Sequence, residues 1–107
     1  MSEYFSIIFN YSNEGDNKIN SDELLSIEAV FLVCDDDENG IEFQVEYIEC
    51  ESENLYSIEL LVENWLYNGI KNTLNHPKKV VFGIEGVEIE VESNNLFIHK
   101  IVELDDC

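Results

Sequence analysis

The chain has 107 residues, of which 45% are hydrophobic, and it carries a formal net charge of −19 at neutral pH. This is the length of a single domain, and the apolar content is too high for a disordered chain. With 24 acidic residues, five lysines and no arginine, the surface repels nucleic acid and anionic membranes, which argues against both as direct partners. We therefore expect one acidic domain over residues 1–107.

The sequence predicts a cytoplasmic protein. Its longest uncharged apolar run, residues 29–34, is far shorter than the roughly 18 residues that a membrane-spanning helix needs. The first residues lack the positively charged region of a signal peptide. The odd number of cysteines, namely Cys34, Cys50 and Cys107, favours reduced thiols over a disulfide framework.

The first third of the chain predicts two strands and a loop. Residues 3–11 are rich in aromatic and β-branched side chains and are typical of a strand. A polar loop follows over residues 13–23, in which Asn20 and Glu23 have the spacing that caps a short helical turn. Residues 26–34 form an apolar run of strand length, which indicates a strand covered on both faces or at the sheet centre.

An acidic turn at residues 35–40 has two readings. Asp35, Asp37, Asn39, Gly40 and Glu46 match the ligand and glycine positions of an EF-hand calcium loop. The flanks, however, indicate strands, and an extended chain from residue 40 to 46 covers about 20 Å, which carries Glu46 away from the aspartates. Because Asn39 and Gly40 both tolerate positive φ, a hairpin turn is favoured. A calcium loop, or a weak ion site of Asp35, Asp37 and Asn39 alone, is the alternative.

After this turn the pattern has a period of two, which predicts a strand with one buried face and one acidic face. The apolar residues Ile41, Phe43, Val45 and Tyr47 alternate with Glu42, Gln44 and Glu46. The phase slips at residues 47–48, so we expect a bulge or bend there.

Residues 57–75 predict a long amphipathic helix. Apolar residues recur there at spacings of three and four over about five turns, as on the buried face of a helix. Pro77 ends the pattern. The opposite face carries Leu60 and Tyr67, seven residues apart, which we predict to be exposed anchors for a partner.

The last third predicts strands at residues 79–83, 86–92 and 96–104. In the middle strand Glu88, Glu90 and Glu92 point to one side, about 6.7 Å apart. Together with Glu42 and Glu46 they would form one acidic sheet face if the two strands lie near each other. A lysine such as Lys100 could instead pair across this ladder and relieve the repulsion.

The predicted fold class is α+β, an antiparallel β-sheet of five or six short strands with one long amphipathic helix packed on one face. No enzyme activity, cofactor or metal site is expected. His76 and His99 have no serine or cysteine partner at a recognised spacing, and no phosphate loop, zinc motif or nucleophile elbow occurs.

The net negative charge of the chain predicts what kind of partner it binds. An acidic surface attracts basic proteins, and a dense array of carboxylates can occupy a groove built for phosphates. We therefore expect a small acidic inhibitor that binds and blocks a nuclease or other nucleic-acid-binding protein. In size, acidity and α+β make-up the chain is similar to immunity proteins and to phage anti-defence inhibitors such as anti-CRISPR and other DNA-mimic proteins, although no motif assigns it to either. The predicted contact residues are Asp35, Asp36, Asp37, Glu42, Glu46, Leu60, Tyr67, Glu88, Glu90 and Glu92.

Three other readings of the acidity stay open at this point. The first is a calcium-binding or structural interaction module with the acidic turn at residues 35–40. The second is a surface that serves only solubility, and the third is adaptation to high salt. The oligomeric state does not follow from the sequence.

Overall fold

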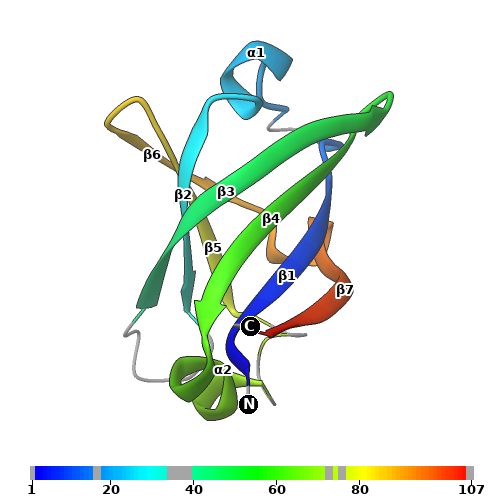
Figure 1. Cartoon of the computed structure of the whole chain (residues 1–107). Helices are drawn as coiled ribbons and strands as arrows, with labels where there is room; N and C mark the ends of the chain where they lie inside the picture. The colour runs from blue at the N-terminus through cyan, green and yellow to red at the C-terminus, as the bar shows by residue number, and fades with distance from the viewer. Residues whose placement is uncertain (1, 16–17, 34–39, 72–73, 75–76, 106–107) are drawn as a thin grey trace.

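The protein forms one antiparallel sheet of seven strands in the order β6-β5-β2-β3-β4-β1-β7 (Figure 1). The computed structural model describes residues 2–15, 18–33, 40–71, 74 and 77–105. Its elements in chain order are β1 (Ser2–Ser12), α1 (Ser21–Leu24), β2 (Ile27–Val33), β3 (Gly40–Ser52), β4 (Leu55–Glu63), α2 (Asn64–Ile70), β5 (Lys79–Ile84), β6 (Val87–Val91), the 3-10 turn η1 (Ser93–Asn95) and β7 (Leu96–Asp105).

The long strand β3 makes the sheet curl. Its first residues pair with β2, and the part from Val45 onward pairs with β4. At the start of the second part the register with β4 shifts, so that Glu46 is an extra residue between Val45 and Tyr47. Such a bulge bends a strand and increases its twist. The predicted slip at residues 47–48 is therefore present as a bulge one residue earlier.

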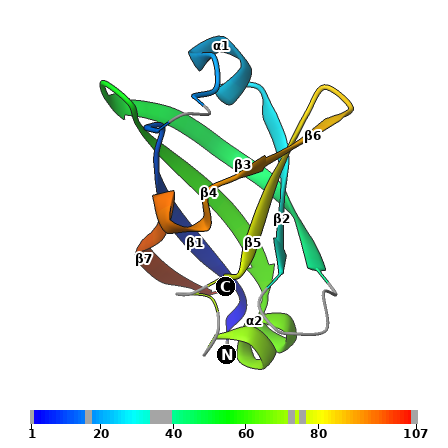
Figure 2. The same cartoon turned by 180° about the vertical axis from the view of Figure 1, so that it is seen from behind.

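The concave side of the sheet encloses the hydrophobic core. Tyr11 on β1 meets Phe82 on β5 edge to face, with ring centroids 5.0 Å apart and an interplanar angle of 76°. In the sheet order, β4, β3 and β2 lie between these two strands. The contact exists because the two halves of the sheet face each other, as both views show (Figures 1 and 2).

Short segments close the two ends of the curled sheet. At one end, Ile19 and Leu24, from the loop before α1 and from α1 itself, are buried in the core. At the other end, α2 buries Ile70, and its Tyr67 stacks on Phe5 of β1 with ring centroids 4.0 Å apart. Figure 1 shows α1 and α2 at opposite ends of the molecule. No helix is needed over a sheet face, because the sheet covers its own apolar side.

The predicted fold class and its long helix are wrong. Among the described residues of the predicted segment, only Asn64–Ile70 is helical, in α2, while Leu55–Glu63 forms β4. In β4 the buried residues are Tyr56, Ile58, Leu60 and Val62, which is a period of two. The sequence of this segment fits both this period of two and the helical spacing of three and four. Pairing with β1 on one side and β3 on the other satisfies the backbone of β4, and this tertiary pairing overrides the helical pattern.

Most other predicted elements are confirmed. The strands expected at residues 3–11, 26–34 and 96–104 correspond to β1, β2 and β7. Of the two readings for residues 26–34, the structure supports the sheet centre, since β2 is the third strand of seven. Asn20 caps α1, its side chain accepting a hydrogen bond from the backbone N of Asp22 at 2.9 Å.

We predict an energetic coupling between Tyr11 and Phe82. The variants Tyr11→Leu and Phe82→Leu, alone and combined, should give a coupling energy of about 0.5–1.5 kcal/mol, because an edge-to-face aromatic pair contributes this much beyond its buried area. Urea unfolding of the four proteins measures it. Leu25→Ala, at an exposed residue, combined with Phe82→Leu is the control and should be additive. Additivity at Tyr11 and Phe82 would contradict the contact between the two halves of the sheet.

The buried Tyr11 predicts loss of stability in alkali. Burial, and secondarily the charge of Glu92, raises the pKa of Tyr11 above its usual value of 10. Above that pH the unfolded chain releases this proton and the folded chain retains it, so the free energy of unfolding falls by up to about 1.4 kcal/mol per pH unit until the folded pKa is reached. Urea unfolding below and above pH 10 should show a smaller loss for Tyr11→Phe. An equal loss in both proteins would assign the effect to other tyrosines.

Candidate partner-binding surface

The convex face of β6, β5, β2 and β3 gathers the acidic residues of two distant segments. The strand registers align Glu88 of β6 with Gly83, Ala29 and Gln44 in one row across the four strands. The next row is Glu90, Val81, Phe31 and Glu42. The predicted acidic ladder therefore shares its face with Glu42, although β5 and β2 lie between them.

A shallow groove lies between these carboxylates. We call it the outer groove, and it has a volume of about 130 Å³. Its lining residues are Ala29, Phe31, Glu42, Val81, Gly83 and Glu88. Glu42 and Glu88 belong to strands three positions apart in the sheet, which places the two strands about 14 Å from each other. The site is thus an apolar floor with a carboxylate on each side.

Small residues create the hollow. Ala29 and Gly83 are neighbours in the register of β2 and β5, and a methyl group added to Gly83 would touch the Cβ of Ala29 at 3.7 Å. At one end the ring of Phe31 fills the space beside Gly40, with its Cε1 atom only 2.0 Å from where a Cβ of Gly40 would lie. A glycine at residue 40 therefore allows Phe31 to lie flat against β3.

The close approach of the Phe31 ring explains the glycine at residue 40 differently from the positive φ expected from the sequence. The glycine does not adopt a positive φ, and it pairs with Val33 at the end of the β2–β3 hairpin. Asn39 lies outside the described residues, so the turn itself is not described. A two-residue turn with positive φ is present at Glu85 and Gly86, between β5 and β6, with φ of 49° and 83°.

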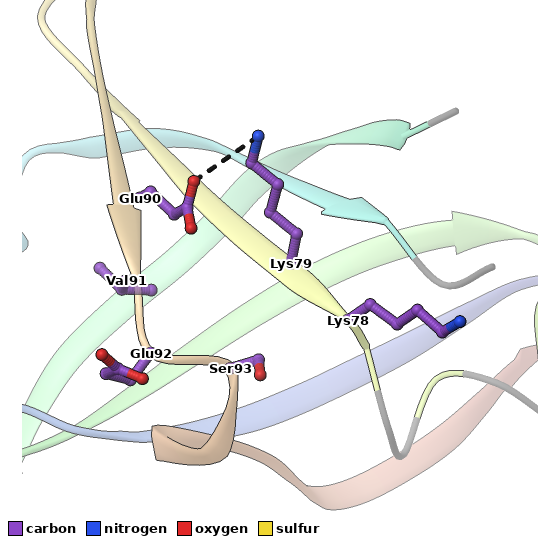
Figure 3. Close-up of a pocket in the computed structure, with 6 residues that line it drawn as sticks. All are labelled: Lys78, Lys79, Glu90, Val91, Glu92 and Ser93. Atoms are coloured by element: carbon purple, nitrogen blue, oxygen red, sulfur yellow. Dashed lines mark ion pairs between the residues drawn. The ribbon is translucent and has the colours of Figure 1, made fainter. Parts of the chain in front are cut away.

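A lysine offsets part of the negative charge of the acidic ladder, which consists of Glu88, Glu90 and Glu92. Lys79 Nζ lies 3.5 Å from Glu90 Oε1, and both side chains remain at least half exposed. This pair borders a second hollow of about 320 Å³, lined also by Lys78, Val91, Glu92 and Ser93 (Figure 3). Lys79 is thus a lysine that pairs across the ladder. Lys100, which we had considered for this role, lies on β7 at the other edge of the sheet.

Like charges also lie close together in a second region, at Glu49 and Glu51 near the end of β3. Tyr47 Oη donates a hydrogen bond to Glu49 Oε2 at 2.9 Å. A hydrogen bond with Glu49, and its charge, raise the pKa of the exposed Glu51 carboxyl, while His99 lowers it in part. The acidity is therefore not confined to the outer groove.

The remaining predicted contact residues are dispersed. Glu46 is the exposed bulge residue of β3, and Glu92 is exposed just after β6. Leu60 is only 1% exposed and belongs to the core, and Tyr67 is half-buried against Phe5. The expectation that these two form an exposed face of one helix was wrong, because Leu60 lies on β4. Asp35, Asp36 and Asp37 lie outside the described residues.

The groove floor was missed by sequence reasoning. Ala29 and Phe31 lie within the apolar run of β2, and Val81 and Gly83 within that of β5. The signal that could have found them is the pair of small residues, Ala29 and Gly83, in otherwise bulky strands. Their alignment depends on the pairing of β2 with β5, which the sequence does not reveal.

The strand β3 contains the second half of the segment that matches a calcium loop. Gly40 to Glu46, the second half of the matched pattern, is extended strand and does not coil around an ion position. Among the described residues, no three acidic, histidine or cysteine side chains gather as a metal site would require.

Comparison of the chain with protein-family models, curated proteins and solved structures finds no match. None of the helices in the described part of the chain is long and apolar enough to cross a membrane.

We predict that filling the hollow above Ala29 weakens partner binding without a large change in stability. Ala29→Leu should occupy the outer groove without changing any charge, and because the site faces solvent the free energy of unfolding should change by less than about 1 kcal/mol. Thermal unfolding measures stability, and binding of any partner that uses the groove should weaken. A large destabilisation would show that Ala29 is needed for folding and that the hollow is not free space.

Proposed function

We propose that this protein is a cytoplasmic acidic inhibitor that binds a basic nucleic-acid-acting protein and blocks it. The observation that carries the proposal is the outer groove, in which Glu42 and Glu88 flank an apolar floor on an exposed sheet face. Such a surface suits lysine and arginine side chains, whose aliphatic stems pack on apolar atoms while their charged ends reach carboxylates.

The overall charge supports the same type of partner. A net charge of −19 accelerates encounter with a basic surface and opposes encounter with an acidic one. Proteins that bind nucleic acid have extended basic surfaces made for phosphates, and carboxylates on a rigid sheet can compete for them. The sheet is a suitable support, because its strands hold the carboxylates at fixed spacings.

Two biological roles share this chemistry. One is an immunity protein that neutralises a nuclease toxin, and the other is an anti-CRISPR or DNA-mimic inhibitor of a nucleic-acid-acting defence protein. Both predict the same contact surface, and they differ in the identity of the captured protein.

Charge reversal of the two groove carboxylates and of Glu90, in register with Val81 of the groove floor, tests the proposal. The variant Glu42→Lys/Glu88→Lys/Glu90→Lys should lose affinity for a basic nucleic-acid-binding partner by about tenfold or more at low salt. Glu14→Lys/Glu23→Lys/Glu53→Lys has the same net charge, alters three exposed residues outside the groove, and should bind nearly as well as the native protein. Both variants are first checked for unchanged thermal unfolding.

The partner is captured from a bacterial lysate at low salt and then released with double-stranded DNA. We expect a nucleic-acid-binding protein in the DNA eluate, present with the native and control proteins and depleted with the groove variant. The purified partner should lose its nucleic-acid activity when the native protein is added. Equal capture by the groove variant, or capture that requires added calcium, would contradict the proposal.

A further inference from the structure

The two edge strands of the sheet differ in charge. The edge strand β6 carries Glu88 and Glu90 within five residues. The other edge strand, β7, carries only one lysine and one glutamate between Leu96 and Leu104. Charged side chains on an edge strand oppose pairing with the edge of another sheet. In this acidic chain β6 is protected in this way, and β7 is nearly neutral over its first nine residues.

The strand β7 has an open backbone edge. Among the described strands, its pairing is with β1 alone. It is ten residues long, or about 33 Å at the usual rise per residue. Because one side of its backbone has no neighbouring strand in this sheet, this side can accept a further strand.

Exposed apolar side chains lie next to this edge. Phe97 is 46% exposed and Leu104 39% exposed. In the register, Leu104 pairs with the exposed Tyr4 of β1, while Val102 and Leu61 lie on either side of Ser6. We call these five apolar residues the β7 patch, defined as Tyr4, Leu61, Phe97, Val102 and Leu104. Trp65, which is 71% exposed and whose Nε1 donates a hydrogen bond to Glu63, borders it.

We propose that β7 pairs antiparallel with β7 of a second copy, forming a two-fold symmetric dimer with a continuous sheet. The charge distribution selects this occupant. A basic partner is attracted to the carboxylates of the other half of the sheet. Between Leu96 and Leu104 it finds apolar residues and two charges that offset each other, Lys100 and Glu103. A second copy presents the same neutral strip, and a two-fold interface needs only one self-complementary surface.

The charge also determines how the dimer responds to salt. Two chains of −19 repel each other, and screening weakens this repulsion as the Debye length falls from about 10 Å at 0.1 M to about 3 Å at 1 M ionic strength. Contacts between apolar side chains and between backbones are not weakened in this way. Dimerisation should therefore strengthen with salt, whereas binding of a basic partner to the outer groove should weaken. The dimer does not depend on the proposed function.

Sedimentation equilibrium of the full chain at about 0.1 M and 1 M ionic strength tests the dimer. We expect a mass of two chains at the higher salt and a dimer dissociation constant lower by about tenfold or more than at the lower salt. Phe97→Lys and Leu104→Lys, made separately at two exposed positions, should each restore the monomer. Val87→Lys is the control, since it adds the same charge to a residue that is 59% exposed on β6, and it should leave the dimer unchanged.

Hydrogen exchange distinguishes strand pairing from contact through side chains alone. In the dimer, backbone amides of β7 should become protected at high salt, and those of β6 should not. A monomer at both salt concentrations, a dimer that survives both β7 substitutions, or a dimer without new protection in β7 would overturn the proposal. The two β7 variants are independent, so a folding failure of one leaves the other as the test.

Discussion

The curvature of the sheet is the constraint on which the rest of this structure depends. In the part of the chain that the structure describes, seven strands with a short helix at each end contain too little helix to cover an apolar sheet face, so the sheet must cover itself. The bulge at Glu46 lets β3 turn from β2 toward β4, and the two halves then face each other. The contact of Tyr11 with Phe82 is the clearest consequence, since it joins strands that are four positions apart in the sheet.

The curvature of the sheet also determines which side chains face water. Every strand that turns one apolar face inward presents the other face to water, and in this chain many of those outward residues are acidic or small. Near β6 the result is a groove of small residues between carboxylates. On β7 the exposed residues include the apolar Phe97 and Leu104, and the charges of Lys100 and Glu103 offset each other. The half of the sheet near β6 is thus where we propose that a basic partner binds, and the β7 edge is where we propose that a second copy pairs.

The two proposed interactions, with a basic partner and with a second copy, should respond to salt in opposite directions. Attraction between carboxylates and a basic protein is screened by ions, and so is repulsion between two copies of the acidic chain. Inside a cell the ionic strength is fixed, so the balance between these surfaces is determined by concentration and by the charge of the partner. The Lys79–Glu90 pair affects this balance little, because exposed ion pairs contribute at most about 1 kcal/mol.

The sequence by itself determined the acidity, most strand positions, the cap of α1 and the outward direction of Glu88 and Glu90, because these features depend on composition and on neighbouring residues. It failed at Leu55–Glu63, where strand and helix periods were both present and the choice depended on pairing with β1 and β3. Only the tertiary structure placed Glu42 on the same face as Glu88, put Leu60 in the core, and left β7 at an edge. Each of these depends on which strands are neighbours, and strand order is decided by contacts between residues far apart in the chain, which local patterns do not encode.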